Sequence, residues 1–109
     1  MKLVVGIVNK DDAGALLDTL VANGYRVTWF QTIGGFLRKE NVTVFTGVED
    51  EQVEQAVRLI QEQCHTRVQS VGSLPPIMKS GEVYALDTEE VEVGGAVIFV
   101  LDVAQFLKA

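Results

Sequence analysis

Arg26 and Thr28 are the residues whose types and spacing best suit anion binding. They lie in a stretch whose side chains alternate between two faces of an expected strand, so the guanidinium and the hydroxyl share one face. Arg26 has no acidic neighbour in the sequence, and a phosphate would satisfy it. The alternative partner is a carboxylate from another subunit or from a long loop.

The segment Gly34-Gly35-Phe36-Leu37-Arg38 combines two glycines with an aromatic ring. Glycines let backbone N–H groups approach an anion closely, and an aromatic ring can stack on a nucleobase. The pattern matches neither a Walker loop nor a dinucleotide-binding fingerprint. The alternative is a distorted hairpin in which Phe36 fills the core. Nearby, Asn41 offers an amide to a base edge and Gly47 an unobstructed backbone.

Cys64 and His65 are adjacent and could in principle bind a metal or carry nucleophilic chemistry. A zinc site needs about four ligands, and the sequence has no other Cys or His. Cys64 falls on the apolar stripe of an expected helix, so we predict that it is buried and that His65 ends this helix. Glu90 and Glu92 are interpreted as a solvated strand entry rather than an acid–base pair. Neither a metal site nor a catalytic site is expected.

The composition excludes several classes of function. The 109 residues suit one domain over 1–109, with a net charge of −6 from nine basic and fifteen acidic side chains. A nucleic-acid polymer is not an expected partner, because no basic cluster is present. The apolar N-terminal run ends at Asn9-Lys10, too early for membrane insertion or an export signal. With a single cysteine, the expected location is cytoplasmic.

The spacing of apolar residues predicts the elements that position these side chains. We expect strands over 3–8, 25–32, 42–48, 67–71 and 90–101, a helix from Asp11 that Asn23-Gly24 stops, and a second helix from Asp50 to Cys64. Residues 72–90 contain Pro75-Pro76 and no apolar period, which is typical of a long, mobile loop. Gly94-Gly95 indicates a bulge or a close backbone approach, and residues 103–108 a helical turn.

This order of strand, helix, strand, strand, helix and strand predicts a ferredoxin-like α+β sandwich, with two helices on one face of an antiparallel sheet. The fold alone does not identify a function. A chain this short leaves much of its surface in water, so we expect subunits to associate.

Three separated blocks resemble the PII-like signal-transduction proteins that act as receptors for cyclic di-AMP. The blocks are Asn23-Gly24-Tyr25-Arg26-Val27-Thr28, then Thr32-Ile33-Gly34-Gly35-Phe36-Leu37-Arg38 with Asn41, Thr43 and Gly47, and finally Val91-Glu92-Val93-Gly94-Gly95-Ala96-Val97-Ile98-Phe99-Val100-Leu101. The resemblance implies a homotrimer without catalytic activity, and no cofactor apart from its ligand. Such a trimer binds the dinucleotide between neighbouring subunits and signals through loop ordering to a partner protein.

The resemblance also implies the binding residues. Carried over position by position, these are Arg26 and Thr28 at the nucleotide, Gly35, Phe36 and Leu37 around a base, Asn41 and Gly47 at the remaining polar contacts, and Phe99 from the last strand.

Two residues depart from the family pattern, which typically reads Gly-Asn-Thr-Thr where this chain has Glu40-Asn41-Val42-Thr43. Glu40 adds negative charge near a dianionic ligand and Val42 lacks a hydroxyl, so weaker or altered nucleotide binding is one hypothesis.

Three alternative functions remain. The same pocket would suit another adenine nucleotide, such as ATP or AMP. A metal-binding trimer similar to CutA would need Cys64 or His65 to be exposed. A small hydrolase of phosphate esters or acyl phosphates would use Arg26 as an anion clamp, but no general base or nucleophile accompanies this arginine.

Overall fold

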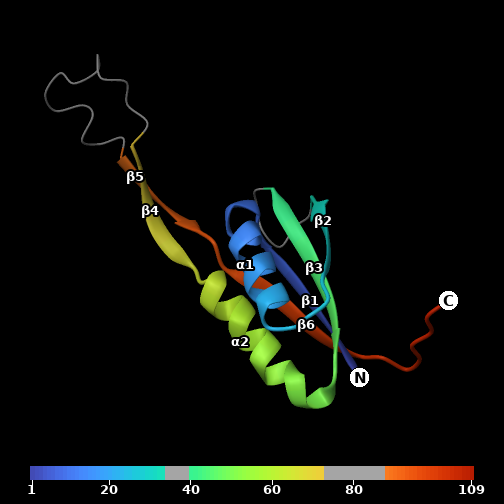
Figure 1. Cartoon of the computed structure of the whole chain (residues 1–109). Helices are drawn as coiled ribbons and strands as arrows, with labels where there is room; N and C mark the ends of the chain where they lie inside the picture. The colour runs from blue at the N-terminus through green and yellow to red at the C-terminus, as the bar shows by residue number, and fades with distance from the viewer. Residues whose placement is uncertain (34–39, 73–87) are drawn as a thin grey trace, which may run out of the picture.

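The computed structural model describes residues 1–33, 40–72 and 88–109. Its elements are β1 (Lys2–Asn9), α1 (Lys10–Ala22), β2 (Thr28–Thr32), β3 (Asn41–Val48), the short 3₁₀ helix η1 (Asp50–Gln52), α2 (Val53–Gln63), β4 (Arg67–Gly72), β5 (Thr88–Val93) and β6 (Ala96–Asp102). Both helices lie on one face of a four-stranded sheet, and a ribbon of β4 and β5 projects from this body (Figure 1).

The main sheet is antiparallel, with the strand order β2-β3-β1-β6. Successive side chains of β1 alternate between its faces, as the apolar run predicts. Val4 and Val8 are fully buried on the helix side, whereas Leu3, Val5 and Ile7 are partly buried on the other side. Two helices on one face of this sheet confirm the expected ferredoxin-like α+β arrangement.

The first helix begins at Lys10, one residue before the predicted Asp11, and ends at the predicted Asn23-Gly24 stop. The Asn9 side chain caps α1 by accepting a hydrogen bond from the backbone N–H of Asp11 at 2.9 Å. Asp11 and Asp12 then occupy the first turn, where the helix dipole favours negative charge. Asn23 is the C-cap, and Gly24 follows with φ +88°, a left-handed conformation that glycine adopts without strain.

The second helix covers β1 and β6 with its apolar stripe. Ala56, Ile60 and Cys64 are buried in the same core as Leu16 and Leu20 of α1. A Cβ added to Gly6 of β1 would meet the Cδ1 atom of Ile60 at 3.4 Å, an ordinary van der Waals distance, so α2 packs directly against β1 at this position. The expected helix from Asp50 is present, although its first three residues form η1.

The predicted strand over 25–32 is too long, because β2 starts at Thr28. The backbone N–H of Tyr25 donates to the carbonyl of Leu20 at 3.0 Å, and its buried phenol donates to the carbonyl of Gln52 at 3.3 Å and contacts the amide oxygen of Gln55. These contacts join Tyr25 to both helices rather than to the sheet.

The single strand predicted over 90–101 is also wrong. Gly94 and Gly95 have φ of +82° and +83°, and this turn separates β5 from β6, which belong to different sheets. Residues 88–90 of the expected loop 72–90 lie in β5, Gly72 ends β4, and residues 73–87 fall outside the described part of the chain.

The helical turn expected over 103–108 is absent. Residues 103–109 have no regular secondary structure, and the backbone N–H of Val103 instead donates to the carbonyl of Met1 at 3.2 Å. This bond ties the start of the C-terminal segment to the first residue of the chain, beside the start of β1.

Candidate ligand-binding site

The face of the main sheet that carries no helix gathers most of the described candidate residues. The register pairs Thr28 with Phe45, Phe45 with Val5, and Val5 with Phe99, so these four residues form one row across the sheet. Phe30 lies on the same face, and its ring contacts that of Phe45 edge-on at 5.3 Å between centroids. The alternation predicted for Arg26, Thr28 and Phe30 is therefore confirmed for Thr28 and Phe30, whereas Arg26 precedes β2 and does not share a strand face with Thr28.

Gly47 shares this face and lies next to the row, two residues beyond Phe45 on β3. The Gly47 position is exposed, and nothing lies within 4 Å of where its Cβ would be. Thr28 and Gly47 therefore flank an open stretch of backbone at the edge of the sheet. Phe99 is exposed but three strands away from Thr28, about 14 Å at the usual strand spacing.

Asn41 lies at the other end of β3. Six residues separate it from Gly47, which corresponds to about 20 Å along a strand. It pairs with Thr32 of β2 and Asn9 of β1, and 2% of its surface is exposed. The hydroxyls of Thr32 and Thr43 lie 3.0 Å apart beside it. One subunit therefore does not bring Asn41 together with Thr28, Gly47 and Phe99.

Arg26 is exposed in the connection between α1 and β2. Among the residues that the structure describes, no carboxylate lies within ion-pair distance of its guanidinium. Within these residues, Arg26 is thus a cation available to an anionic partner. Gly35, Phe36 and Leu37 lie outside the described residues.

Glu40 does not present an uncompensated charge. Its carboxylate accepts a hydrogen bond from the Lys10 ammonium at 2.9 Å, and its backbone carbonyl accepts one from the Lys10 N–H at 3.2 Å. The hydrogen bond and the charge of Glu40 raise the pKa of Lys10. The expected repulsion of a dianionic ligand by Glu40 is therefore partly offset by Lys10.

Val42 lies on the opposite side of the sheet from the candidate residues. It pairs with Val8, and 3% of its surface is exposed, because its side chain packs into the core beneath the helices. A hydroxyl at this position would face the core rather than a ligand on the open face. The lack of a hydroxyl at Val42 consequently leaves the chemistry of the open face unchanged.

Cys64 and His65 line a separate, open surface pocket of about 410 Å³ on the helix side of β6. Its walls are Gln61, Cys64, His65, Thr66, Gly95, Ala96 and Ile98. Burial is the main cause that raises the pKa of the Cys64 thiol to about 12, and the nearby negative charge of Asp12 adds to it. The thiol therefore stays protonated at neutral pH. The ring of His65 lies 3.3 Å from the carbonyl of Glu62. No cluster of metal-ligating side chains occurs among the described residues.

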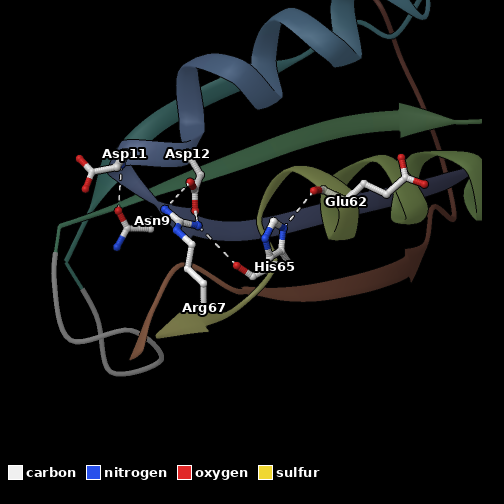
Figure 2. Close-up of polar contacts among 6 residues, drawn as sticks. All are labelled: Asn9, Asp11, Asp12, Glu62, His65 and Arg67. Atoms are coloured by element: carbon white, nitrogen blue, oxygen red, sulfur yellow. Dashed lines mark hydrogen bonds and ion pairs between the residues drawn. The ribbon is translucent and has the colours of Figure 1, made fainter. Parts of the chain in front are cut away.

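The sequence patterns did not reveal an ion pair between Asp12 and Arg67. The guanidinium of Arg67 donates to both carboxylate oxygens, at 3.0 and 3.3 Å (Figure 2). The hydrogen bond and the charge of Asp12 raise the pKa of Arg67. Fifty-five residues separate the partners, so no local spacing links them. The buried position of Asp12 on an otherwise apolar helix face is the one signal that a partner was required.

Comparison with known proteins adds two findings. The family model described as a cyclic-di-AMP receptor matches residues 1–109. A crystal structure of a functionally unknown protein from Pediococcus pentosaceus ATCC 25745 is similar to this chain, with 34% sequence identity and a TM-score of 0.75. The match covers 99% of this chain and 96% of the other chain.

Proposed function

Because the chain belongs to the cyclic-di-AMP receptor family, we propose that it binds cyclic di-AMP at the interfaces of a homotrimer and signals without catalysis. The observation that carries this proposal is the whole-chain family match, together with the exposed Arg26, which has no ion-pair partner among the described residues and lies beside the open sheet face. Arg26 binds a phosphate, and Thr28 supplies a hydroxyl from the same edge.

The separation of the candidate residues supports a site between subunits. Asn41 and Gly47 lie at opposite ends of β3. One ligand therefore contacts both residues most readily when one subunit contributes the Asn41 end of β3 and its neighbour contributes the Gly47 end. The open face is also apolar, with Phe30, Phe99 and Leu101 each more than 40% exposed. A contiguous apolar face of this kind is typical of an interface, and we assign it to subunit contacts.

Gly35, Phe36 and Leu37 complete the proposed site by enclosing a base, as the resemblance implies. Ligand binding then orders the chain around the site, and a partner protein in the cytoplasm reads this change. The helices in the described ranges are all too short or too polar to cross a membrane.

Isothermal titration with cyclic di-AMP tests this function. We expect about one ligand per subunit, and Arg26→Ala should weaken binding at least about tenfold, because a charge-assisted contact to phosphate is lost. Arg58→Ala is the matched control, since Arg58 is an exposed arginine on α2, away from the open face. ATP and AMP are titrated in parallel.

Absence of binding by cyclic di-AMP would overturn the proposal. Binding of ATP or AMP instead would identify the receptor as one for another adenine nucleotide. Equal affinities of Arg26→Ala and the wild type would remove Arg26 from the site.

A further inference from the structure

The first turn of α1 contacts the chain on the N-terminal side of Asn41. Asn9, which caps this helix, is the register partner of Asn41. The next residue, Lys10, binds Glu40 twice, through its ammonium at 2.9 Å and its backbone N–H at 3.2 Å. The turn therefore holds both Glu40 and Asn41 in place.

The same turn also holds the base of the β4–β5 ribbon. The side chain of Asp12 is 10% exposed, and it accepts two hydrogen bonds from Arg67, the first residue of β4. Gly94, which follows β5, passes so close that an added Cβ would lie 2.5 Å from a guanidinium nitrogen of Arg67. Figure 2 shows Asp12 and Arg67 pointing toward each other, with Asn9 and Asp11 beside them.

The ribbon depends on this attachment. Its two strands pair with each other and form a sheet separate from the main one. An isolated two-stranded ribbon is marginally stable in water, so its orientation and stability are set by its base. At the base, Arg67 hydrogen-bonds to Asp12, and a Cβ added to Gly94 would lie 3.2 Å from the Asp12 carboxylate. Asp12 is two residues from Lys10 in one capped turn.

We propose that this turn, residues 9–12, couples the proposed ligand contact at Asn41 to the β4–β5 ribbon, with Lys10 and Asp12 as positioning residues. The proposal rests on the proposed function for its ligand. Lys10 and Asp12 belong to one hydrogen-bonded turn, so a displacement at Glu40 and Asn41 moves Asp12 and changes its contact with Arg67. Such coupling acts equally in both directions.

Hydrogen exchange of the backbone amides in residues 67–72 and 88–93 tests the coupling, measured with and without saturating cyclic di-AMP. In the wild type we expect the ligand to slow exchange in the ribbon by about threefold or more. In Arg67→Ala the ligand still binds by calorimetry, but the ribbon response is lost. Lys2→Ala is the control, because it breaks the Lys2–Asp102 pair at the other end of β1 and should leave the response intact.

Two outcomes would overturn the coupling while leaving the function standing. One is a wild-type protein that binds the ligand with no change in the ribbon. The other is an Arg67→Ala variant that binds and keeps the full response. Absence of binding in the wild type would instead overturn the proposed function.

Ligand-free exchange measurements test the coupling by themselves. Glu40→Gln breaks the exposed pair with Lys10, and we expect exchange in the ribbon to become about twofold faster. Arg67→Ala should reciprocally speed exchange at the start of β3, with unchanged amides in the middle of β1 as evidence of an intact fold. The charge swap of Lys10→Glu with Glu40→Lys should restore the wild-type rates. The proposal would be contradicted if each substitution changed the exchange rates only in the segment around the substituted residue.

Discussion

Cys64 is the C-cap residue of α2, and 1% of its surface is exposed. This burial changes the acidity of its thiol. Burial raises the pKa of its thiol from 9.0 to about 12, and the negative charge of Asp12 acts in the same direction. The neutral thiol is therefore the form that the folded protein favours. In the unfolded chain the thiol is hydrated and ionises near its ordinary pKa.

Stability should consequently fall as the pH rises above 9. Below the unfolded pKa of 9.0 both states bind the proton and the contribution is complete, and it is lost as the pH rises toward 12. The slope from this thiol is at most about 1.4 kcal/mol per pH unit. Urea denaturation between pH 8.5 and 10.5 measures it, with Cys64→Ala as the comparison.

The variant retains every Lys and Tyr that titrates in this range, so the difference between the two slopes isolates the thiol. We expect a shallower decline in Cys64→Ala. Parallel slopes would mean that water reaches Cys64 in the folded state.

Residue-level expectations succeeded where the deciding interaction was local. Alternation along β2 correctly placed Thr28 on the same face as Phe30, and helical spacing correctly buried Cys64. The expectation for Glu40 was incomplete, because its partner Lys10 lies 30 residues away. Contacts between such distant residues depend on how β1 pairs with β3, which no local pattern specifies.

Among the elements, β5 and β6 show how two residues redirect a continuous strand pattern. The run over 90–101 is rich in β-branched residues on both sides of Gly94 and Gly95. Both glycines have positive φ, and at this pair the chain passes from the sheet of β5 to the sheet of β6. Propensity predicts extended backbone on either side but not the change of sheet. The paired glycines were correctly identified as a special backbone position, and their effect is larger than the expected bulge.

Gly94→Ala should destabilise the protein by about 1 to 3 kcal/mol. An L-residue at φ +82° is strained, and the new Cβ would meet the Arg67 guanidinium and the His65 carbonyl at less than 3 Å. Chemical denaturation measures the loss, and hydrogen exchange in β4 and β5 shows whether the ribbon is affected first.

The control for this substitution is Gly14→Ala. Gly14 lies in α1 with negative φ and nothing within 4 Å of its Cβ position, so alanine should stabilise the helix by up to about 1 kcal/mol. Equal effects of the two substitutions would contradict the role assigned to the Gly94 turn.

For the whole molecule, the distribution of burial is uneven between the two faces of the sheet. The helices bury the central part of one face, with Val4, Val8 and Val44 at most 1% exposed, whereas Trp29 and Val100 on the two edge strands of that face stay about half exposed. The other face keeps Phe99 and Leu101 almost half exposed, and β6 becomes more exposed toward its end. The length of the chain predicted a need for association, whereas the face that we assign to subunit contacts is identified only from the register of the strands.

Leu101→Glu should therefore dissociate the proposed trimer without unfolding the subunit. Leu101 is 47% exposed and pairs with Leu3 on the open face, so a carboxylate there stays hydrated in a single subunit but would be desolvated between subunits. Light scattering coupled to size exclusion should give three times the 11.9 kDa subunit mass for the wild type and a smaller mass for the variant.

Val21→Glu is the matched control, because Val21 is an apolar residue of α1 that is 63% exposed on the helix side, and this variant should remain trimeric. Leu101→Glu should weaken the binding of cyclic di-AMP as well as lower the mass measured by light scattering, since the proposed site needs residues of neighbouring subunits. Unchanged binding by a monomeric variant would place the ligand within one subunit. A trimer that tolerates Leu101→Glu would instead place the subunit contacts on another face.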